Sequence, residues 1–387
     1  MERRLIPAVF ARGGTSKAVI FKAADLPEDR ALWDGIFLHV LGSPDPYGRQ
    51  LNGLGGGLSS LSKVVVVAPS EREDADVDYT FVQVAVREAV ADHGAMCGNM
   101  SAAVGPFAVD EGLVRAGEGQ TLVRVHNTNT GKLFHAAFPV RGGRAVEEGD
   151  FTIPGVAGSG AMIRLEYLSP GGAVTGRLLP TTRPADRLSV EGLGEVAASL
   201  VDSSNPVVFV RAADLGRTAT ESPEELDADA ALMARLEQIR RAGSVAMGLS
   251  RTQAEAGLSN PKVAMIGPPA PFTALDGRRY GARAYHVAMR IVSVGNIHRA
   301  APLTGAMCLA VAAQIPGSIA APLAPPEGPL LIGTPSGVLP VEAEVRVSGG
   351  RAEAVSATTF RTQRRLMEGA VPMPAALLGR GPRLRTH

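Results

Sequence analysis

The sequence is poor in cysteine and in aromatic residues, and it carries almost no net charge. Two cysteines occur in 387 residues and they form no Cys-x-x-Cys pair, so we expect neither a disulfide framework nor a thiolate metal site. The 39 basic residues are balanced by 38 acidic ones. This balance lacks the excess of positive charge that is typical of nucleic-acid-binding proteins, and we expect no nucleic-acid partner.

The sequence also has no long apolar run and no metal-binding pattern of histidines. No stretch approaches the roughly 18 apolar residues of a membrane-spanning helix, and the first residues lack the apolar centre of a signal peptide. We therefore expect a cytoplasmic protein that does not associate with membranes. The seven histidines show no His-x-His, His-x-x-x-His or His-Glu-x-x-His spacing, so we expect no metal site.

What the chain has in abundance is length and turn-forming residues. Its 387 residues predict two or more domains, and a hydrophobic content of 45% is enough for sizeable cores. The 45 glycines and 28 prolines are spread along the whole chain. This distribution predicts many tight turns between short strands.

The most informative segment surrounds Cys97. This cysteine precedes a run of small residues that predicts a helix, with Asn99 or Ser101 as its cap. A helix N-terminus exposes unpaired N–H groups and the positive end of the dipole, which favour a thiolate and can also hold a substrate carboxylate. The alternative is a buried, purely structural cysteine. Pro106 predicts that the helix is short, or bent at Gly105-Pro106.

Two further segments combine glycine with lysine. The turn Arg12-Gly-Gly-Thr-Ser-Lys17 between two predicted strands is either an anion-holding nest or a plain glycine turn. A glycine-rich loop over residues 52–62 leads into Lys63 and then into four valines. It is not a phosphate-binding P-loop, because the lysine begins a strand instead of a helix. Lys63 is thus expected at the mouth of a buried strand, unless it simply extends into solvent.

The second half of the chain repeats one feature of the first. The segment His298 to Ala313 again places a glycine-containing turn, Thr304-Gly305, before a helix of small residues. If Gly98 and Gly305 are equivalent, the offset of this weak repeat is 305 − 98 = 207 residues. We interpret the chain as two pseudo-symmetric halves with the site between them, because ligand sites favour domain interfaces.

Taken together, the motifs resemble those of the PrpF family over nearly the whole chain. Its members include 2-methylaconitate cis-trans isomerase, aconitate isomerase, methylitaconate Δ-isomerase and 4-oxalomesaconate tautomerase. The motifs that carry the resemblance are Arg12-Gly-Gly-Thr-Ser-Lys17, Gly42-Ser-Pro-Asp-Pro46, the serines before Lys63, Val77-Asp-Tyr79, Cys97-Gly-Asn-Met100, Val104-Gly-Pro-Phe107 and Thr304-Gly-Ala306.

The resemblance implies a fold, a domain division and a site. The fold is the α+β, diaminopimelate-epimerase-like fold, in which two similar domains each wrap β-structure around a central helix. The domains are expected at residues 1–185 and 186–387, with the last strands able to pack back on the first domain. Lys63 and Cys97 are the implied catalytic pair. The residues expected to bind the substrate are Gly14, Thr15, Ser16, Lys17, Ser60, Gly98, Asn99, Met100, Asn205, His298, Thr304 and Gly305.

The implied activity is that of an isomerase without a cofactor. It would remove a proton from an unsaturated di- or tricarboxylate, such as 2-methylaconitate or aconitate, and return it after the double bond has shifted or rotated. The alternatives are an oxo-acid tautomerase, a methylitaconate Δ-isomerase, and a non-catalytic carboxylate-binding protein on the same fold. Homodimers or larger homo-oligomers are compatible with this activity.

A two-cysteine racemase fits less well. Epimerases of this fold use a second cysteine in the second domain, but Pro302 stands near that position here. Cys308 lies further along the predicted helix and is expected to belong to the core. The missing second thiol favours double-bond isomerisation over racemisation.

Overall fold

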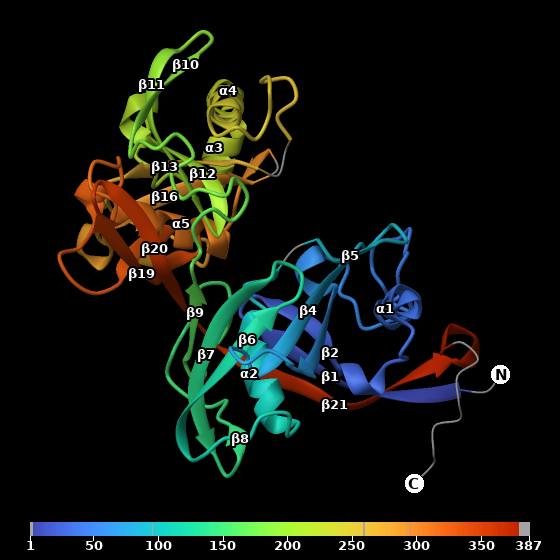
Figure 1. The fold of residues 1–387 in the computed structure, drawn as a ribbon. Helices are drawn as coiled ribbons and strands as arrows, with labels where there is room; N and C mark the ends of the chain where they lie inside the picture. Colours follow the sequence, from blue (N-terminus) through green and yellow to red (C-terminus); the bar gives the residue numbers. More distant parts are fainter. Residues whose placement is uncertain (1–2, 95, 258–259, 294, 379–387) are drawn as a thin grey trace. The chain divides into compact units, whose positions relative to one another are not determined.

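The computed structural model describes residues 3–94, 96–257, 260–293 and 295–378, which form two compact units (Figure 1). The first unit runs to Leu165 and resumes at Arg361, and the second unit is Glu166–Phe360. The chain leaves the first unit within strand β9 (Ile163–Leu168) and returns at the end of β20 (Arg351–Arg361).

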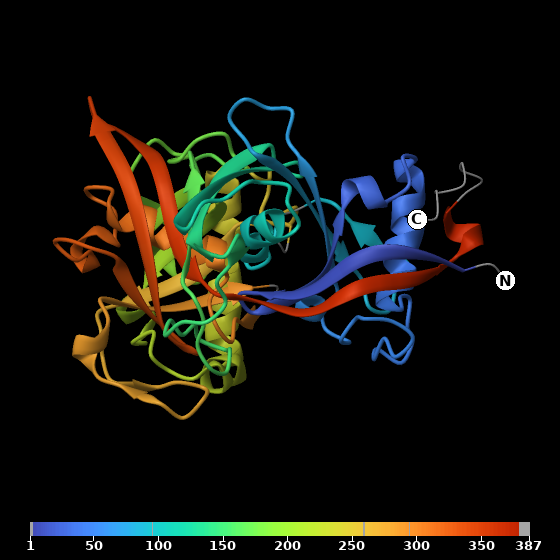
Figure 2. The same cartoon turned by 90° about the horizontal axis from the view of Figure 1, so that it is seen from below.

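The division between the units differs from the predicted boundary at 185/186. Residues after Leu165 already belong to the second unit, where Gly172 N donates to Asp202 O at 2.7 Å and Asp202 N donates to Leu178 O at 2.9 Å. The last strand belongs to the first unit, because β21 (Gln363–Pro374) pairs with β1 along its whole length (Figure 2). A turn-rich linker sequence carries no signal of which unit its backbone hydrogen bonds will join.

The strands of the first unit form a sheet that surrounds helix α2. β1 is antiparallel to β21 and to β2, β2 is parallel to β3, β3 is antiparallel to β4, β4 is parallel to β6, and β6 is antiparallel to β7. The elements are β1 (Arg3–Gly13), β2 (Ser16–Lys22), β3 (Lys63–Pro69), β4 (Val77–Val84), β5 (Ala91–Asp92), β6 (Gly119–Asn127), β7 (Lys132–Arg141), β8 (Arg144–Ala145), α1 (Trp33–Leu41) and α2 (Ser101–Asp110).

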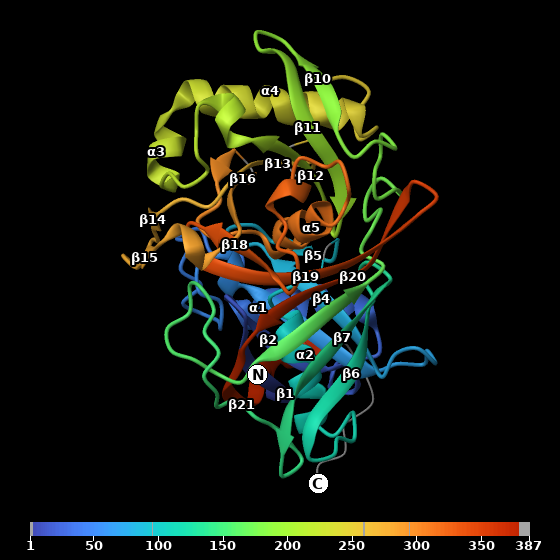
Figure 3. The ribbon, with the colours of Figure 1, turned by 90° about the vertical axis from the view of Figure 1, so that its left-hand side faces the viewer.

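The second unit repeats this order around helix α5, which lies beside β11, β12 and β19 (Figure 3). β11 is antiparallel to β12, β12 is parallel to β13, β13 is antiparallel to β16, β16 is parallel to β18, and β18 is antiparallel to β19. The elements are β10 (Asp186–Val190), β11 (Gly194–Ser203), β12 (Asn205–Arg211), β13 (Lys262–Gly267), β14 (Phe272–Thr273), β15 (Arg279–Tyr280), β16 (Val287–Ser293), β17 (Asn296–Ile297), β18 (Leu330–Thr334), β19 (Gly337–Ser348), α3 (Pro223–Ala228), α4 (Ala230–Ala246) and α5 (Leu303–Ala313).

The internal repeat is therefore a repeat of topology. In each unit the chain forms a helix between the first two parallel strands, α1 between β2 and β3 or α4 between β12 and β13. The central helix follows in the connection between the second parallel pair, α2 between β4 and β6 or α5 between β16 and β18. The registers match as well. Lys63 opens β3 opposite Ala18 of β2, and Lys262 opens β13 opposite Val207 of β12.

The central helices are buried because small residues cover most of their surface. In α2 every residue from Ser101 to Val109 is buried, and the helix contacts β1, β6, β7, β8 and β21. α2 continues through Gly105 and Pro106 for ten residues and does not stop at the proline. A Cβ atom at Gly105 would lie 2.7 Å from Phe138 Cε1, so this glycine lets β7 approach the helix.

The other helices differ in detail from the sequence pattern. The segment 28–41 forms a 3₁₀ turn, η2 (Arg30–Leu32), before α1 begins. Helices α3 and α4 are separated at Asp229, because its side chain accepts from Leu232 N at 3.0 Å and caps α4 as a new helix. Among the described residues, no helix combines the length and apolarity needed to cross a bilayer.

Candidate functional site

The glycine turn between β1 and β2 is a hairpin that lies against the segment preceding α2. Gly13 pairs with Ser16, which leaves Gly14 and Thr15 at the tip. Thr15 N donates to Asn99 Oδ1 at 3.4 Å. Gly14 has φ of +51°, and a Cβ atom there would lie 2.4 Å from the same oxygen. The hairpin therefore requires glycine for two reasons, the left-handed backbone and the proximity of Asn99.

The side chain of Arg12 fixes the backbone of the hairpin through hydrogen bonds. Its guanidinium donates to Gly14 O at 2.9 Å and to Thr362 O at 3.0 Å. Burial, followed by the nearby charge of Arg364, lowers the pKa of Arg12. These hydrogen bonds connect the predicted carboxylate-binding turn to Thr362, the residue between β20 and β21.

Cys97 lies in a turn four residues before α2 and is half-buried. Its carbonyl accepts from Ser101 N at 3.0 Å, from Ser101 Oγ at 3.1 Å and from Tyr79 OH at 3.3 Å. Three donors on one carbonyl fix the backbone of the cysteine. The first N–H groups of α2 already have acceptors, because Ala102 N donates to Asn99 O at 3.2 Å and Ala103 N donates to Met100 O at 2.9 Å. A thiolate or carboxylate held by backbone N–H groups next to Cys97 stays a prediction.

The predicted cap of this helix is wrong. The N-cap residue is Met100, and no side chain caps it. Asn99 instead uses its side-chain oxygen to accept from Thr15 and from Arg361 Nε, the latter at 3.3 Å. Asn99 does not cap the helix because its side-chain oxygen is already bonded to the β1–β2 hairpin and to a strand far away in the sequence.

Lys63 is the first residue of β3 and is buried, with 7% of its surface exposed. Its Nζ lies 2.5 Å from Gln83 Oε1 and 5.0 Å from the centroid of the Phe81 ring. Both contacts come from β4, where Gln83 stands directly opposite Lys63. The predicted place of Lys63 at the mouth of a buried strand is confirmed, and the alternative of a solvent-exposed lysine is wrong.

The loop before Lys63 is tied down by a buried glutamine. Gln50 is 1% exposed; it donates to Ser43 Oγ at 2.8 Å and accepts from Gly57 N at 2.9 Å and from Ser62 Oγ at 2.6 Å. The glycine-rich loop is therefore an ordered structure around one amide, and it does not form a phosphate cradle.

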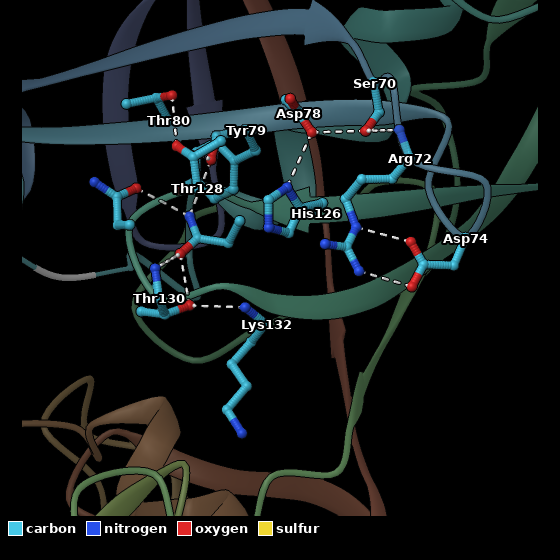
Figure 4. A network of polar contacts seen from close by, with 12 residues as sticks. Ser70, Arg72, Asp74, Asp78, Tyr79, Thr80, His126, Thr128, Thr130 and Lys132 are labelled. Carbon is cyan, nitrogen blue, oxygen red and sulfur yellow. Dashed lines mark hydrogen bonds and ion pairs between the residues drawn. The ribbon is translucent and has the colours of Figure 1, made fainter.

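A polar network fixes the opposite side of β4 (Figure 4). Asp78 is bonded to Ser70 Oγ at 2.8 Å and to His126 Nδ1 at 3.0 Å, and Thr80 is bonded to Thr128 at 2.7 Å. These contacts hold β4 to β6 and to the turn after it. β4 is thus a firm support for Tyr79, which reaches Cys97, and for Gln83, which reaches Lys63.

The remaining predicted residues of the first unit lie near these groups in sequence and topology. Ser16 and Lys17 begin β2, and Lys17 Nζ lies 5.4 Å from the centroid of the Phe10 ring. Ser60 lies in the short 3₁₀ segment η3 (Ser59–Leu61), and Met100 is fully buried against Gly13. Gly98 belongs to the turn between Cys97 and α2.

Four predicted residues lie in the second unit. Asn205 opens β12 after a tight turn. His298 Nδ1 accepts from Ala300 N at 3.1 Å, and the pKa of His298 is lowered, first by burial and then by the charge of Lys262. Thr304 and Gly305 stand inside the first turn of α5, which begins at Leu303, and not in a separate turn before the helix. A site formed by both units stays a prediction.

Cys308 belongs to the core, as predicted. It is fully buried in α5, and its thiol donates to Val201 O at 3.3 Å. Burial raises the pKa of Cys308. Pro302 is the N-cap of α5, so this helix has no cysteine at its head. Among the residues that the structure describes, no group of three His, Cys, Asp or Glu side chains could hold a metal ion.

Gln83, Tyr79 and Arg361 contact the predicted site residues but were not predicted from the sequence. Gln83 is 20 residues from Lys63, and Arg361 is 262 residues from Asn99. Gln83 could have been found from the alternating apolar residues of Val77–Val84, because it is the polar residue near the end of a strand that pairs with the one opened by Lys63. Arg361 has no local signal.

Comparison with known proteins identifies the family. The model of the PrpF family, described as PrpF protein, matches residues 3–374. The chain belongs to the PrpF family. It is 40% identical to 3-methylitaconate isomerase of Eubacterium barkeri over 96% of this chain and 98% of that protein. It is 36% identical to 2-methyl-aconitate isomerase of Shewanella oneidensis over 95% of this chain and 97% of that protein.

Solved structures give the same answer for the fold. A crystal structure of methylitaconate-delta-isomerase superposes with a TM-score of 0.90 at 38% identity, covering 100% of both chains. A hydroxyproline epimerase from Agrobacterium vitis matches with a TM-score of 0.50 at 14% identity, covering 97% of this chain and 95% of that one. This PrpF protein therefore has the diaminopimelate-epimerase-like fold and is an isomerase, and both predictions are confirmed.

Proposed function

We propose that this PrpF protein moves or rotates the double bond of an unsaturated di- or tricarboxylate by proton abstraction and reprotonation. The relatives named above are isomerases of 3-methylitaconate and of 2-methyl-aconitate. Both acids carry a C=C bond and a removable proton adjacent to it. The class of substrate is inferred from this shared chemistry.

The observation that carries the proposal lies in the first unit. A buried lysine stands at the head of β3, and a half-buried cysteine stands before the head of α2. The hairpin that joins β1 to β2 connects them, because β2 pairs with Lys63 while Thr15 at its tip contacts Asn99. Two groups that can transfer protons thus lie on elements that share the predicted carboxylate-binding turn.

The reaction follows from the chemistry of these groups. Either neutral Lys63 or the thiolate of Cys97 removes a proton from the carbon next to the double bond. The electron pair then delocalises onto a carboxylate oxygen, which gives a dienolate. Backbone N–H groups of the turn that precedes α2 would stabilise the negative charge where it develops. Return of a proton to the other end shifts the double bond, and rotation before its return interconverts the cis and trans acids.

A substrate panel tests the proposal. The purified protein is mixed with aconitates, 2-methylaconitate, methylitaconate and oxalomesaconate, and turnover is followed by ultraviolet absorbance and by proton NMR in D₂O. We expect conversion of at least one acid with uptake of deuterium. We expect Lys63→Ala and Cys97→Ala each to lower kcat about 10²–10⁴-fold, the range for loss of a general acid or base.

Matched variants control for folding. Lys22→Ala removes a lysine that is ion-paired with Glu111 at 3.4 Å outside the site, and Cys308→Ala removes the core cysteine. Both should retain turnover. Full activity of the Cys97→Ala protein on the true substrate would contradict the mechanism. Conversion of the substrate in D₂O without any uptake of deuterium would contradict it as well. The cytoplasmic location and a homo-oligomeric state stay predictions.

A further inference from the structure

The side chain of Gln83 forms a hydrogen bond with the buried Nζ of Lys63. The two residues are paired across the antiparallel strands β3 and β4, and Gln83 Oε1 accepts from Lys63 Nζ at 2.5 Å. A buried lysine gains a fixed position from such a contact, because its four-carbon side chain otherwise has many rotamers.

Neighbouring carbonyl groups fix the orientation of the Gln83 amide. Its Nε2 donates to Ser59 O at 2.9 Å and to Ser62 O at 3.0 Å. A flipped amide would place its oxygen against these two carbonyl oxygens and its NH₂ group against the amino group of Lys63. The acceptor atom therefore faces the lysine in the only arrangement that satisfies every partner.

The acceptors of this amide are themselves held in place. Ser62 Oγ lies 2.6 Å from Gln50 Oε1 and 2.8 Å from Leu58 O, and its single proton can be donated to either oxygen. Gln50 in turn binds the glycine-rich loop through Gly57 N. The network runs from the loop through Ser62 and Gln83 to Lys63, so the loop and the lysine are positioned together.

The partner of Lys63 is also neutral. Within the described part of the chain, no Asp or Glu forms an ion pair with Lys63. The charged groups on the elements packed against β3 are engaged elsewhere: Lys17 lies over the Phe10 ring, Asp25 of η1 (Ala23–Asp25) is 3.9 Å from Lys22, and Asp78 is bonded to Ser70 and His126. A carboxylate at position 83 would instead favour the charged form of the lysine.

We propose that Gln83 is a positioning residue for Lys63, which it orients without the negative charge that would keep the lysine protonated. The inference rests on the proposed function, in which neutral Lys63 exchanges a proton with the substrate. It explains why an amide, and not a carboxylate, stands opposite this lysine.

Two variants separate position from charge. Gln83→Glu keeps an acceptor and adds a negative charge, whereas Gln83→Leu removes the acceptor at similar volume. For Gln83→Glu we expect the ascending limb of the kcat/KM profile to move upward by about one pH unit or more, the usual effect of one close opposite charge. Turnover at pH 7 should fall about tenfold or more and recover at high pH. Gln83→Leu should lower kcat about tenfold at every pH with little change in KM.

A second readout does not need turnover. Acetic anhydride labels only neutral amines, so mass spectrometry of the Lys63 peptide over a pH series gives the pH at which the lysine becomes reactive. This midpoint should be higher in Gln83→Glu than in the wild type. Gln120→Glu, an added charge on an exposed residue of β6, serves as the control and should change neither readout. Circular dichroism monitors folding of every variant.

The outcomes distinguish the inference from the proposed function. If no acid of the panel is converted by the wild type, the proposed function fails, and the labelling series still tests the positioning of Lys63. If Gln83→Glu and the wild type label with the same midpoint and share one pH profile, the inference is overturned. A Gln83→Leu protein that is folded and has the kcat of the wild type would also overturn it.

Discussion

At the scale of single residues, the site depends on close packing between the hairpin tip and Asn99. A Cβ atom at Gly14 would approach Asn99 Oδ1 to 2.4 Å and Arg361 Cδ to 3.2 Å. The amide of Asn99 can lie against the turn only because position 14 has no side chain. Glycine is thus as specific a part of this site as the residues with functional groups.

Gly14→Ala should therefore damage the site more than the fold. The left-handed backbone, with φ of +51°, costs alanine about 1–2 kcal/mol of folding free energy. The displaced Asn99 should also lose its bond from Thr15, and we expect KM to rise about tenfold or more. Steady-state kinetics and chemical denaturation of the purified variant measure the two effects.

Gly142→Ala is the matched control. Gly142 has φ of +58° in the turn between β7 and β8, and nothing lies within 4 Å of a Cβ atom built there. The stability loss should be similar, while KM should stay that of the wild type. If both variants raised KM equally, backbone strain alone would explain the effect and the packing of Asn99 against Gly14 would be irrelevant.

At the scale of elements, α2 is adapted to its surroundings at a cost to its intrinsic propensity. Gly105 and Pro106 are poor helix residues, yet the helix passes through both. A Cβ atom at Gly105 would be 2.7 Å from Phe138 Cε1 and 3.0 Å from Ala136 Cβ. Close packing of β7 against the helix therefore requires glycine at position 105, and the sequence of the helix itself gives no sign of this contact.

Gly105→Ala should destabilise the protein although alanine is the better helix former. Overpacking against β7 is expected to lower the free energy of unfolding by about 1–3 kcal/mol. Gly35 of α1 is the comparison, because its Cβ atom would meet only Leu377 Cδ2 at 3.8 Å. Gly35→Ala should raise the free energy of unfolding by about 0.5–1 kcal/mol. Urea denaturation of both variants gives the signs, and a stabilising Gly105→Ala would refute the packing argument.

How much the sequence could predict also follows from the elements. The strand that Lys63 opens and the hairpin before β2 have local signals, four valines in one case and paired glycines in the other, and both were predicted. The Gln83 and Arg361 contacts could not be predicted in the same way, because each depends on strand pairing or on chain return. The cap of α2 was wrongly predicted for the same reason, because the side chain of Asn99 bonds to Thr15 and Arg361 and leaves the helix uncapped.

At the scale of the whole molecule, the two units share a topology but differ in the residues before their central helices. Both begin the third strand of the repeat with a lysine, Lys63 or Lys262, and both place a small-residue helix at the centre. The pKa of Lys262 is lowered by burial and by Arg240. Only the first unit has a cysteine before its central helix. The sequence predicted the repeat from the two glycine-containing turns before helices of small residues, whereas the boundary between the units depended on backbone hydrogen bonds.

The difference between the two cysteines predicts how the native protein reacts with thiol reagents. Cys97 is half-buried in a turn, whereas Cys308 is fully buried and hydrogen-bonded to Val201 O. Dithionitrobenzoate should modify one thiol per native chain and both thiols in guanidinium chloride. Burial and a raised pKa protect Cys308, so the thiol modified in the native protein should be Cys97. Activity should therefore be lost at the rate of this reaction. Cys308→Ala should react and lose activity like the wild type, and Cys97→Ser should show no native reaction. Rapid modification of both thiols in the native protein would show that α5 is not the closed core helix of its unit.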